Sequence, residues 1–144
     1  TKMSKSAGNV INLSDNSETV KKKVMGMYTD PARVHGDEAG DVRNNPVFTY
    51  LDAFVHEVKS QSVKVKVNEY KEKYRMGKVK DVQVKEFLIE VLEEFMQPVR
   101  TLRAKYEKNI EYVDKILKEG TRKAQAEAQK TLKDVKRAMK MSYF

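Results

Sequence analysis

Apolar residues recur at helical spacing along most of this 144-residue chain. The pattern is strongest after Asp81, where apolar positions follow one another at intervals of three and four: Val84, Leu88, Val91, Phe95, Val99, Leu102 and Tyr106. This spacing places their side chains on one face of a helix. We therefore expect the segment to be the central core helix, with Asp81 as its cap and Pro98 inside it.

Two shorter helices are predicted before this segment. Asp15 followed three residues later by Glu18 is a capping-box pattern, which predicts a helix from there to about residue 27. Asn45-Pro46 is a favourable helix start, and the apolar positions after it also recur at helical spacing: Val47, Tyr50, Leu51, Phe54 and Val58. Residues 28–45 contain glycines, Asp-Pro and Asn-Asn, and they predict an irregular connector.

Residues 62–67 form the one ambiguous segment. Their sequence, Ser-Val-Lys-Val-Lys-Val, alternates with period two, which is typical of a strand. No second alternating run exists that could pair with it. We therefore expect a helix here, continuing through Tyr70 and Tyr74 and ending at Gly77.

Two further helices are predicted after the central one. The first covers residues 110–118 and ends near Gly120, and the second covers residues 121–139. Their expected inward-facing residues are Ile110, Val113, Leu117, Ala124, Ala128, Leu132, Val135 and Met139. The whole pattern predicts an all-α bundle of five to six helices. Residues 1–14 would form a flexible loop, and residues 15–144 the helical domain.

Charge and composition narrow the function classes. The chain holds 29 Lys and Arg residues against 21 Asp and Glu, a net charge of +8. The excess lies in two basic blocks, residues 61–80 and 121–144, which would suit a polyanion such as RNA. Lysines that only keep helix surfaces soluble explain these blocks equally well.

The same composition excludes several chemistries. The chain has no cysteine, which excludes a disulfide scaffold, a cysteine-ligated zinc site and thiol catalysis. Its two histidines, His35 and His56, lack the spacing of metal ligands, so we expect no metal site in the chain. No apolar run approaches the roughly 20 residues of a membrane span, so we expect no membrane partner.

The N-terminal residues carry the clearest chemical motif. Lys2, Met3, Ser4, Lys5 and Ser6 are followed by Gly8-Asn9. Two mobile ammonium groups, with hydroxyls and loop N–H groups between them, suit phosphate oxygens, although a solvated Lys/Ser tail would look the same. The string resembles the second signature of class I aminoacyl-tRNA synthetases. That resemblance implies that residues 2–6 bind the phosphates of ATP, with Lys5 stabilising the departing pyrophosphate and Lys2 assisting it.

The sequence after the motif resembles bacterial tryptophanyl-tRNA synthetases over essentially the whole chain. The matching segments are residues 10–15, 21–31, 45–54, 98–103, 117–120 and 128–139. The resemblance implies the C-terminal part of an enzyme that activates tryptophan with ATP and Mg²⁺ to tryptophanyl-adenylate and transfers it to tRNA(Trp). It further implies a cytoplasmic enzyme, and a homodimer whose contacts lie largely in the catalytic half.

The other half of such an enzyme has no counterpart in these residues. No His-Ile-Gly-His-type signature and no parallel-sheet pattern is visible, so we expect the chain alone to bind no ATP tightly and to form no adenylate. Two alternatives stay open: part of another class I synthetase of the tyrosyl type, and a non-catalytic helical module that binds RNA or a partner protein.

The resemblance also implies that the helical part binds the anticodon arm of tRNA. Cations at helix ends and near Pro98 are the candidates: Arg75, Lys78, Arg100, Arg103, Arg122 and Lys123. Each of them could instead be an ordinary partner in a surface ion pair.

Overall fold

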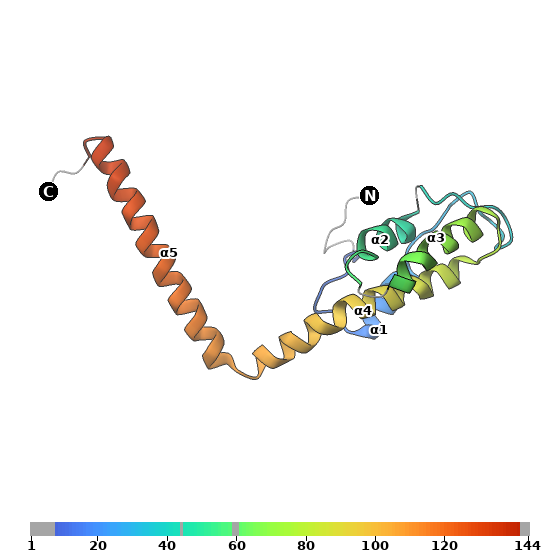
Figure 1. The fold of residues 1–144 in the computed structure, drawn as a ribbon, viewed down its shortest axis with the longest axis horizontal. Coiled ribbons are helices and arrows are strands. Elements are labelled where there is room, and N and C mark those ends of the chain that lie inside the picture. Colours follow the sequence, from blue (N-terminus) through green and yellow to red (C-terminus); the bar gives the residue numbers. More distant parts are fainter. Residues whose placement is uncertain (1–7, 44, 59–60, 142–144) are drawn as a thin grey trace. The chain divides into compact units, whose positions relative to one another are not determined.

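A computed structural model describes residues 8–43, 45–58 and 61–141 of the chain. These residues form five helices, shown in Figure 1: α1 (Ser17–Met25), α2 (Pro46–Phe54), α3 (Gln61–Arg75), α4 (Asp81–Glu107) and α5 (Ile110–Ala138). The predicted all-α class is therefore confirmed. Contacts divide the chain into two units, Thr1–Thr101 and Leu102–Phe144. The predicted boundary after residue 14 stays a prediction.

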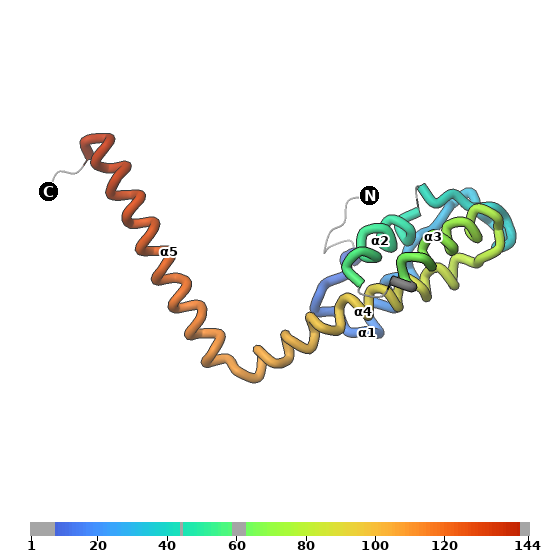
Figure 2. The backbone as a smooth tube through the Cα atoms, viewed as in Figure 1, coloured from blue at the N-terminus to red at the C-terminus, as the bar shows by residue number. Residues whose placement is uncertain are grey.

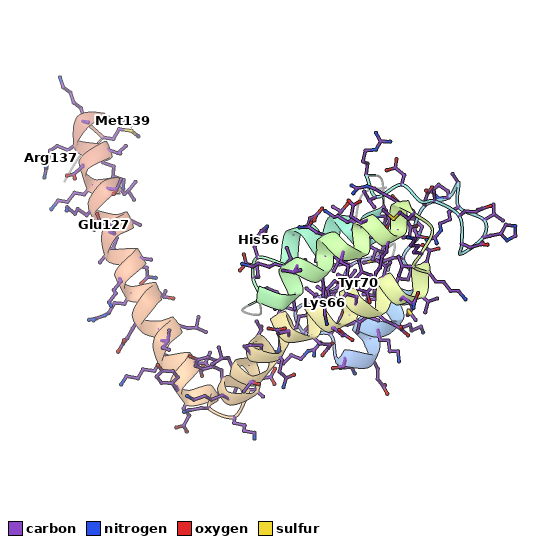
Figure 3. The ribbon with its side chains drawn as sticks, turned by 45° about the vertical axis from the view of Figure 1, so that its right-hand side comes forward. His56, Lys66, Tyr70, Glu127, Arg137 and Met139 are labelled. Carbon is purple, nitrogen blue, oxygen red and sulfur yellow. The ribbon has the colours of Figure 1, made fainter. Side chains whose placement is uncertain are left out.

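The core of the first unit is built around α4. Three aromatic pairs join its helices: Phe54 of α2 with Phe95 of α4, Tyr70 of α3 with Phe87 of α4, and Phe48 of α2 with Tyr74 of α3. Figure 2 shows α2 and α3 side by side, and Figure 3 shows Tyr70 on the α3 side that faces α4. Helix α1 adds Val20 and Val24, both fully buried. The four helices thus share one hydrophobic core, formed by the apolar positions of their stripes.

The starts of α1 and α2 are set by asparagine caps. The Asn45 side chain accepts a hydrogen bond from the Val47 N–H at 3.0 Å, and Pro46 is the first residue of α2, as predicted. The predicted cap at Asp15 is wrong, because the Asn16 side chain accepts from the Thr19 N–H at 2.8 Å. Either residue type can cap a helix, and the Asp15 carboxylate is occupied by other partners.

The alternating segment is helical, as expected. It lies in α3, where Val67 is buried and Val65 is exposed. Helix α3 ends at Arg75, and Gly77 follows with a positive φ of 68°. A Cβ atom on Gly77 would lie 2.1 Å from the carbonyl oxygen of Asp37. Glycine is therefore required here both by the backbone conformation and by the close approach of the connector.

The irregular connector is held in place by a buried arginine. The Arg33 side chain is fully buried, and its guanidinium donates to the backbone oxygens of Val79, at 2.7 Å, and of Gly36. It also lies 4.4 Å from the centre of the Tyr74 ring and 3.4 Å from the carboxylate of Asp81. The connector is therefore packed against the turn between α3 and α4. No local sequence pattern points to this role of Arg33.

The prediction of inward-facing residues after Thr101 is wrong. Leu102 and Tyr106 of α4 are 53% and 45% exposed, and α5 has no buried residue. Residues 110–138 form one helix instead of two, with Gly120 in its interior. A glycine costs only about 1 kcal/mol in a helix, which is too little to end one with good helix formers on both sides.

The apolar stripe of α5 is therefore exposed along the described part of the helix. Figure 3 shows the side chains of Glu127, Arg137 and Met139 extending outward from it. Among the described residues, no helix combines the length and the apolar character needed to cross a lipid bilayer.

Candidate functional site

The lysine-containing motif itself, Lys2, Met3, Ser4, Lys5 and Ser6, lies outside the described residues. The structure begins with the segment that leaves the motif and enters α1, which we call the exit segment (residues 8–16). Gly8 opens it with a positive φ of 66°. The geometry given below is therefore that of the exit segment and of the residues that bind it.

The exit segment closes into a turn around Asp15. The Asp15 carboxylate accepts hydrogen bonds from the backbone N–H of Asn12 at 2.9 Å and from its side-chain amide at 3.3 Å. The ammonium of Lys23, in the last turn of α1, donates to the same carboxylate at 2.5 Å. Lys23, followed by the Asn12 donors, holds the pKa of Asp15 below its ordinary value although burial acts in the opposite direction. The turn is thus built around an ionised carboxylate.

Arg100 of α4 joins the exit segment to the core. Its Nε donates to the backbone oxygen of Asp15 at 2.9 Å, and its Nη1 donates to the hydroxyl of Ser17 at 3.1 Å. The same guanidinium binds both carboxylate oxygens of Glu93, at 2.6 and 3.1 Å. Ser17 donates to Glu93 at 2.7 Å, so the three side chains form a closed ring of hydrogen bonds.

The charges of this ring reinforce each other. The hydrogen bonds from Arg100, and secondarily the one from Ser17, hold the pKa of Glu93 below its ordinary value. Glu93 in turn raises the pKa of Arg100 above its ordinary value. Glu90 and Glu94 of the same helix are exposed, whereas Glu93 is half-buried and paired. A glutamate seven residues before an arginine gives no recognisable sequence signal.

An apolar pocket lies between the exit segment and helices α2 and α4. It has a volume of about 260 Å³ and is lined by Ile11, Asn12, Leu13, Thr49, Tyr50, Ala53, Phe54, Leu92, Phe95 and Met96. Ile11 also packs against the core of the first unit. The exit segment is therefore held by apolar contacts as well as by the Arg100 ring.

The described residues contain no group of three or more His, Cys, Asp or Glu side chains that could hold a metal ion. Asp15 and Glu93 are each satisfied by cationic partners from the protein.

The predicted tRNA-binding cations belong to both units of the chain: Arg75, Lys78 and Arg100 to the first, and Arg103, Arg122 and Lys123 to the second. Arg75 and Lys78 lie at the end of α3 and just after it, and both are exposed. Arg75 pairs with Glu72 at 2.5 Å and lines a hollow of about 470 Å³ together with Arg43. This hollow is lined by two arginines and by two aspartates, Asp30 and Asp41, and Arg43 is paired with Asp41 at 3.0 Å.

The other candidate cations differ in their exposure and in their ion pairs. Arg103 is exposed and pairs only with Glu107 of its own helix, at 2.7 Å. Arg122 and Lys123 are exposed on α5. Arg100 is engaged by the ring described above. The other five candidate cations are thus exposed on the surface. The N–H groups of Arg100 are bound to Asp15, Ser17 and Glu93.

Known proteins resemble the chain over most of its length. Residues 1–97 match the family model described as tRNA synthetases class I (W and Y). The tryptophan–tRNA ligase of Treponema pallidum is 47% identical over 141 residues, which cover 98% of this chain and 40% of that protein. The corresponding protein of Streptococcus mutans is 44% identical over 143 residues, covering 99% of this chain and 41% of its own length.

A solved structure supports the fold. The crystal structure of tryptophanyl-tRNA synthetase from Campylobacter jejuni superposes with a TM-score of 0.75 at 22% identity, covering 96% of this chain and 42% of that one. The chain spans about 40% of the length of the curated relatives it matches. It is similar to part of the tryptophan–tRNA ligases named above, and it belongs to the class I tRNA synthetases of the W and Y family.

Proposed function

We propose that this chain acts within a tryptophan–tRNA ligase, supplying the loop that binds the ATP phosphates and the helices that bind tRNA(Trp). The observation that carries the proposal is the 47% identity to such a ligase over 98% of the chain, in a sequence that contains the lysine motif at residues 2–6. The name of that relative supplies the amino acid and the tRNA, and the family supplies the use of ATP.

The proposed reaction has two steps. The carboxylate of tryptophan attacks the α-phosphorus of ATP, the bond between the α-phosphorus and the bridging oxygen breaks, and pyrophosphate leaves with the electron pair. A terminal ribose hydroxyl of tRNA then attacks the adenylate carbonyl and AMP leaves. Negative charge grows on the pyrophosphate in the first step, so ammonium groups from Lys5 and Lys2 would lower its barrier. Mg²⁺ would share this charge in the complete enzyme.

The exposed cations of the helices are the proposed contacts for tRNA. Arg75 is the last residue of α3 and Lys78 follows it closely, while Arg103 lies one turn before the end of α4. Arg122 and Lys123 lie on α5. Each neutralised phosphate releases counterions, so such contacts make binding dependent on salt. The hollow beside Arg75 and Arg43 would suit a base that is unstacked from its loop, because a guanidinium plane can stack on a base.

Pyrophosphate exchange tests the proposal. The full-length protein that carries this chain should catalyse ATP–pyrophosphate exchange that depends on tryptophan, whereas tyrosine should support none. Exchange with tyrosine in place of tryptophan would favour the tyrosyl-type alternative. Absence of exchange with both, together with retained tRNA binding, would favour the non-catalytic RNA-binding module. The 144-residue chain alone should show no exchange, and detectable exchange would refute the assignment of roles.

The remaining expectations follow from the same proposal. The complete enzyme would be a cytoplasmic homodimer with contacts outside the helices described here. Sedimentation of the full-length protein with and without these 144 residues would test where the dimer contacts lie.

A further inference from the structure

We infer that Arg100 is a positioning residue for the adenylate-forming step, because it fixes the exit segment of the ATP loop to α4. This inference rests on the proposed function. It gives Arg100 a different role from the tRNA contact that its charge and its place near Pro98 suggest. The argument comes from the number of its partners, from where they lie in the chain, and from what else holds the same segment.

The guanidinium of Arg100 has almost no free donor. Its Nε is bound to the backbone oxygen of Asp15, and its Nη1 to both Ser17 and Glu93. Its Nη2 is bound to Glu93 and lies 3.9 Å from the sulfur of Met96. A guanidinium carries five N–H groups, and here they all point at protein partners. A phosphate of tRNA could bind only by displacing them.

The partners of Arg100 lie far away in sequence and close to the motif. Asp15 and Ser17 precede Arg100 by 85 and 83 residues. Asp15 follows the motif lysine Lys5 by ten residues, and the exit segment begins three residues after that lysine. Arg100 is therefore the residue of α4 that binds the chain where it passes from the motif into the helices.

Other contacts also hold the exit segment and α1 in the first unit. Lys85 donates to the backbone oxygen of Met25 at 2.9 Å, which holds the far end of α1. Lys23 binds Asp15 but belongs to α1 itself, so it does not join the segment to α4. Ile11 contributes apolar contacts. At Asp15 and Ser17, the start of α1 is bound to α4 by the Arg100 guanidinium and by the Glu93–Ser17 hydrogen bond.

The link between Arg100 and the exit segment matters because the proposed reaction depends on where the motif lysines are placed. The loop must bring ammonium groups to the phosphates as charge develops on them, and misplacement by about 1 Å can cost about 100-fold in rate. Removing the hydrogen bonds of Arg100 would leave the motif lysines themselves unchanged. It would allow the exit segment, which follows them in the chain, to move relative to α4. The expected defect is in activation, and it should appear without any tRNA in the assay.

The test compares Arg100→Ala, Arg100→Lys and Ser17→Ala in the full-length protein, with Lys105→Ala as an exposed control from the last turn of α4. Tryptophan-dependent ATP–pyrophosphate exchange is measured per active site, and the KM for tRNA is measured in aminoacylation. We expect Arg100→Ala to lower the exchange kcat at least about tenfold, with the KM for tRNA within about twofold of wild type. Arg100→Lys should rescue little, because one ammonium cannot reproduce the three-partner geometry.

Ser17→Ala keeps the test usable if Arg100→Ala does not fold, and it should lower exchange in the same direction by a smaller factor. Unchanged exchange per active site in these variants would overturn the inference, and so would a defect confined to the KM for tRNA or to the fraction of active enzyme. Lack of exchange in the wild-type protein would instead refute the proposed function, so the two failures can be told apart.

Discussion

The guanidinium of Arg100 and the carboxylate of Glu93 form a two-point ion pair within α4, at 2.6 and 3.1 Å. Their side chains are only 19% and 27% exposed. In the pair formed by Arg103 and Glu107, both side chains are 59% exposed. Water and salt weaken the inner pair less, so it can stabilise the start of α1 against α4.

This pair predicts a pH dependence of stability. Arg100 holds the pKa of Glu93 in the folded chain below the ordinary value of 4.5. The stabilisation is therefore fully present above that value and is lost as the pH falls through the lower folded-state pKa. Glu93→Gln should reduce the loss of unfolding free energy between about pH 7 and about pH 3, measured by urea unfolding. Glu94→Gln, an exposed neighbour, should leave that loss unchanged. An equal loss in wild type and Glu93→Gln would contradict the prediction.

Two glycine substitutions should act in opposite directions. Gly77→Ala places a side chain at a φ of 68° and within 2.1 Å of the Asp37 carbonyl oxygen, so it should destabilise the chain by about 3 kcal/mol or more. Gly120→Ala meets nothing within 4 Å inside α5, and it should stabilise the helix by about 1 kcal/mol. Urea unfolding measures the first change, and about fivefold slower amide exchange around residue 120 measures the second. A neutral Gly77→Ala would show that the connector can move away from that turn.

Arg33 should be among the most sensitive positions of the first unit. Arg33→Ala leaves the buried backbone oxygen of Val79 without its donor and also removes the bond to Gly36, so it should cost about 3 kcal/mol of unfolding free energy. The matched control is Arg43→Ala, which removes an arginine that is exposed and paired with Asp41. It should change stability by less than about 1 kcal/mol. Similar effects of the two substitutions would argue against a structural role for the buried guanidinium.

The helix-end cations should act on tRNA binding. In the full-length protein, Arg75→Ala combined with Lys78→Ala should weaken tRNA affinity about tenfold and should lower the salt dependence by about one phosphate contact or more. Lys21→Ala combined with Lys22→Ala removes the same charge from α1 and should leave both quantities near wild type. Filter binding over a salt series measures them. Equal weakening by the two double variants would mean that only net charge matters.

The first unit of the fold was predictable because its helices bury the faces that their sequence marks. The stripe from Val84 to Phe95 and the Asn45-Pro46 start both follow from local spacing and capping, and both are present in the structure. The alternating segment around Val65 was correctly predicted to be helical, because an isolated strand has no second strand to pair with.

The errors have physical causes of a different kind. Leu102 and Tyr106 continue the periodic pattern beyond the core, and periodicity cannot report whether a partner covers a helix face. The Arg100–Glu93–Ser17 ring joins positions 83 residues apart, and such long-range polar contacts leave no pattern in a single sequence. The roles proposed for Lys2 and Lys5 follow from the motif, whereas the contacts of the exit segment that follows it are visible only in three dimensions.

The most direct test of the central claim is the effect of Lys5→Ala on tryptophan-dependent ATP–pyrophosphate exchange by the full-length protein. Lys21→Ala, an exposed lysine of α1, serves as the control. If Lys5 stabilises the departing pyrophosphate, its removal should lower the exchange kcat by about 100-fold or more while tRNA affinity stays at the wild-type value. Exchange at the wild-type rate in Lys5→Ala would contradict the account.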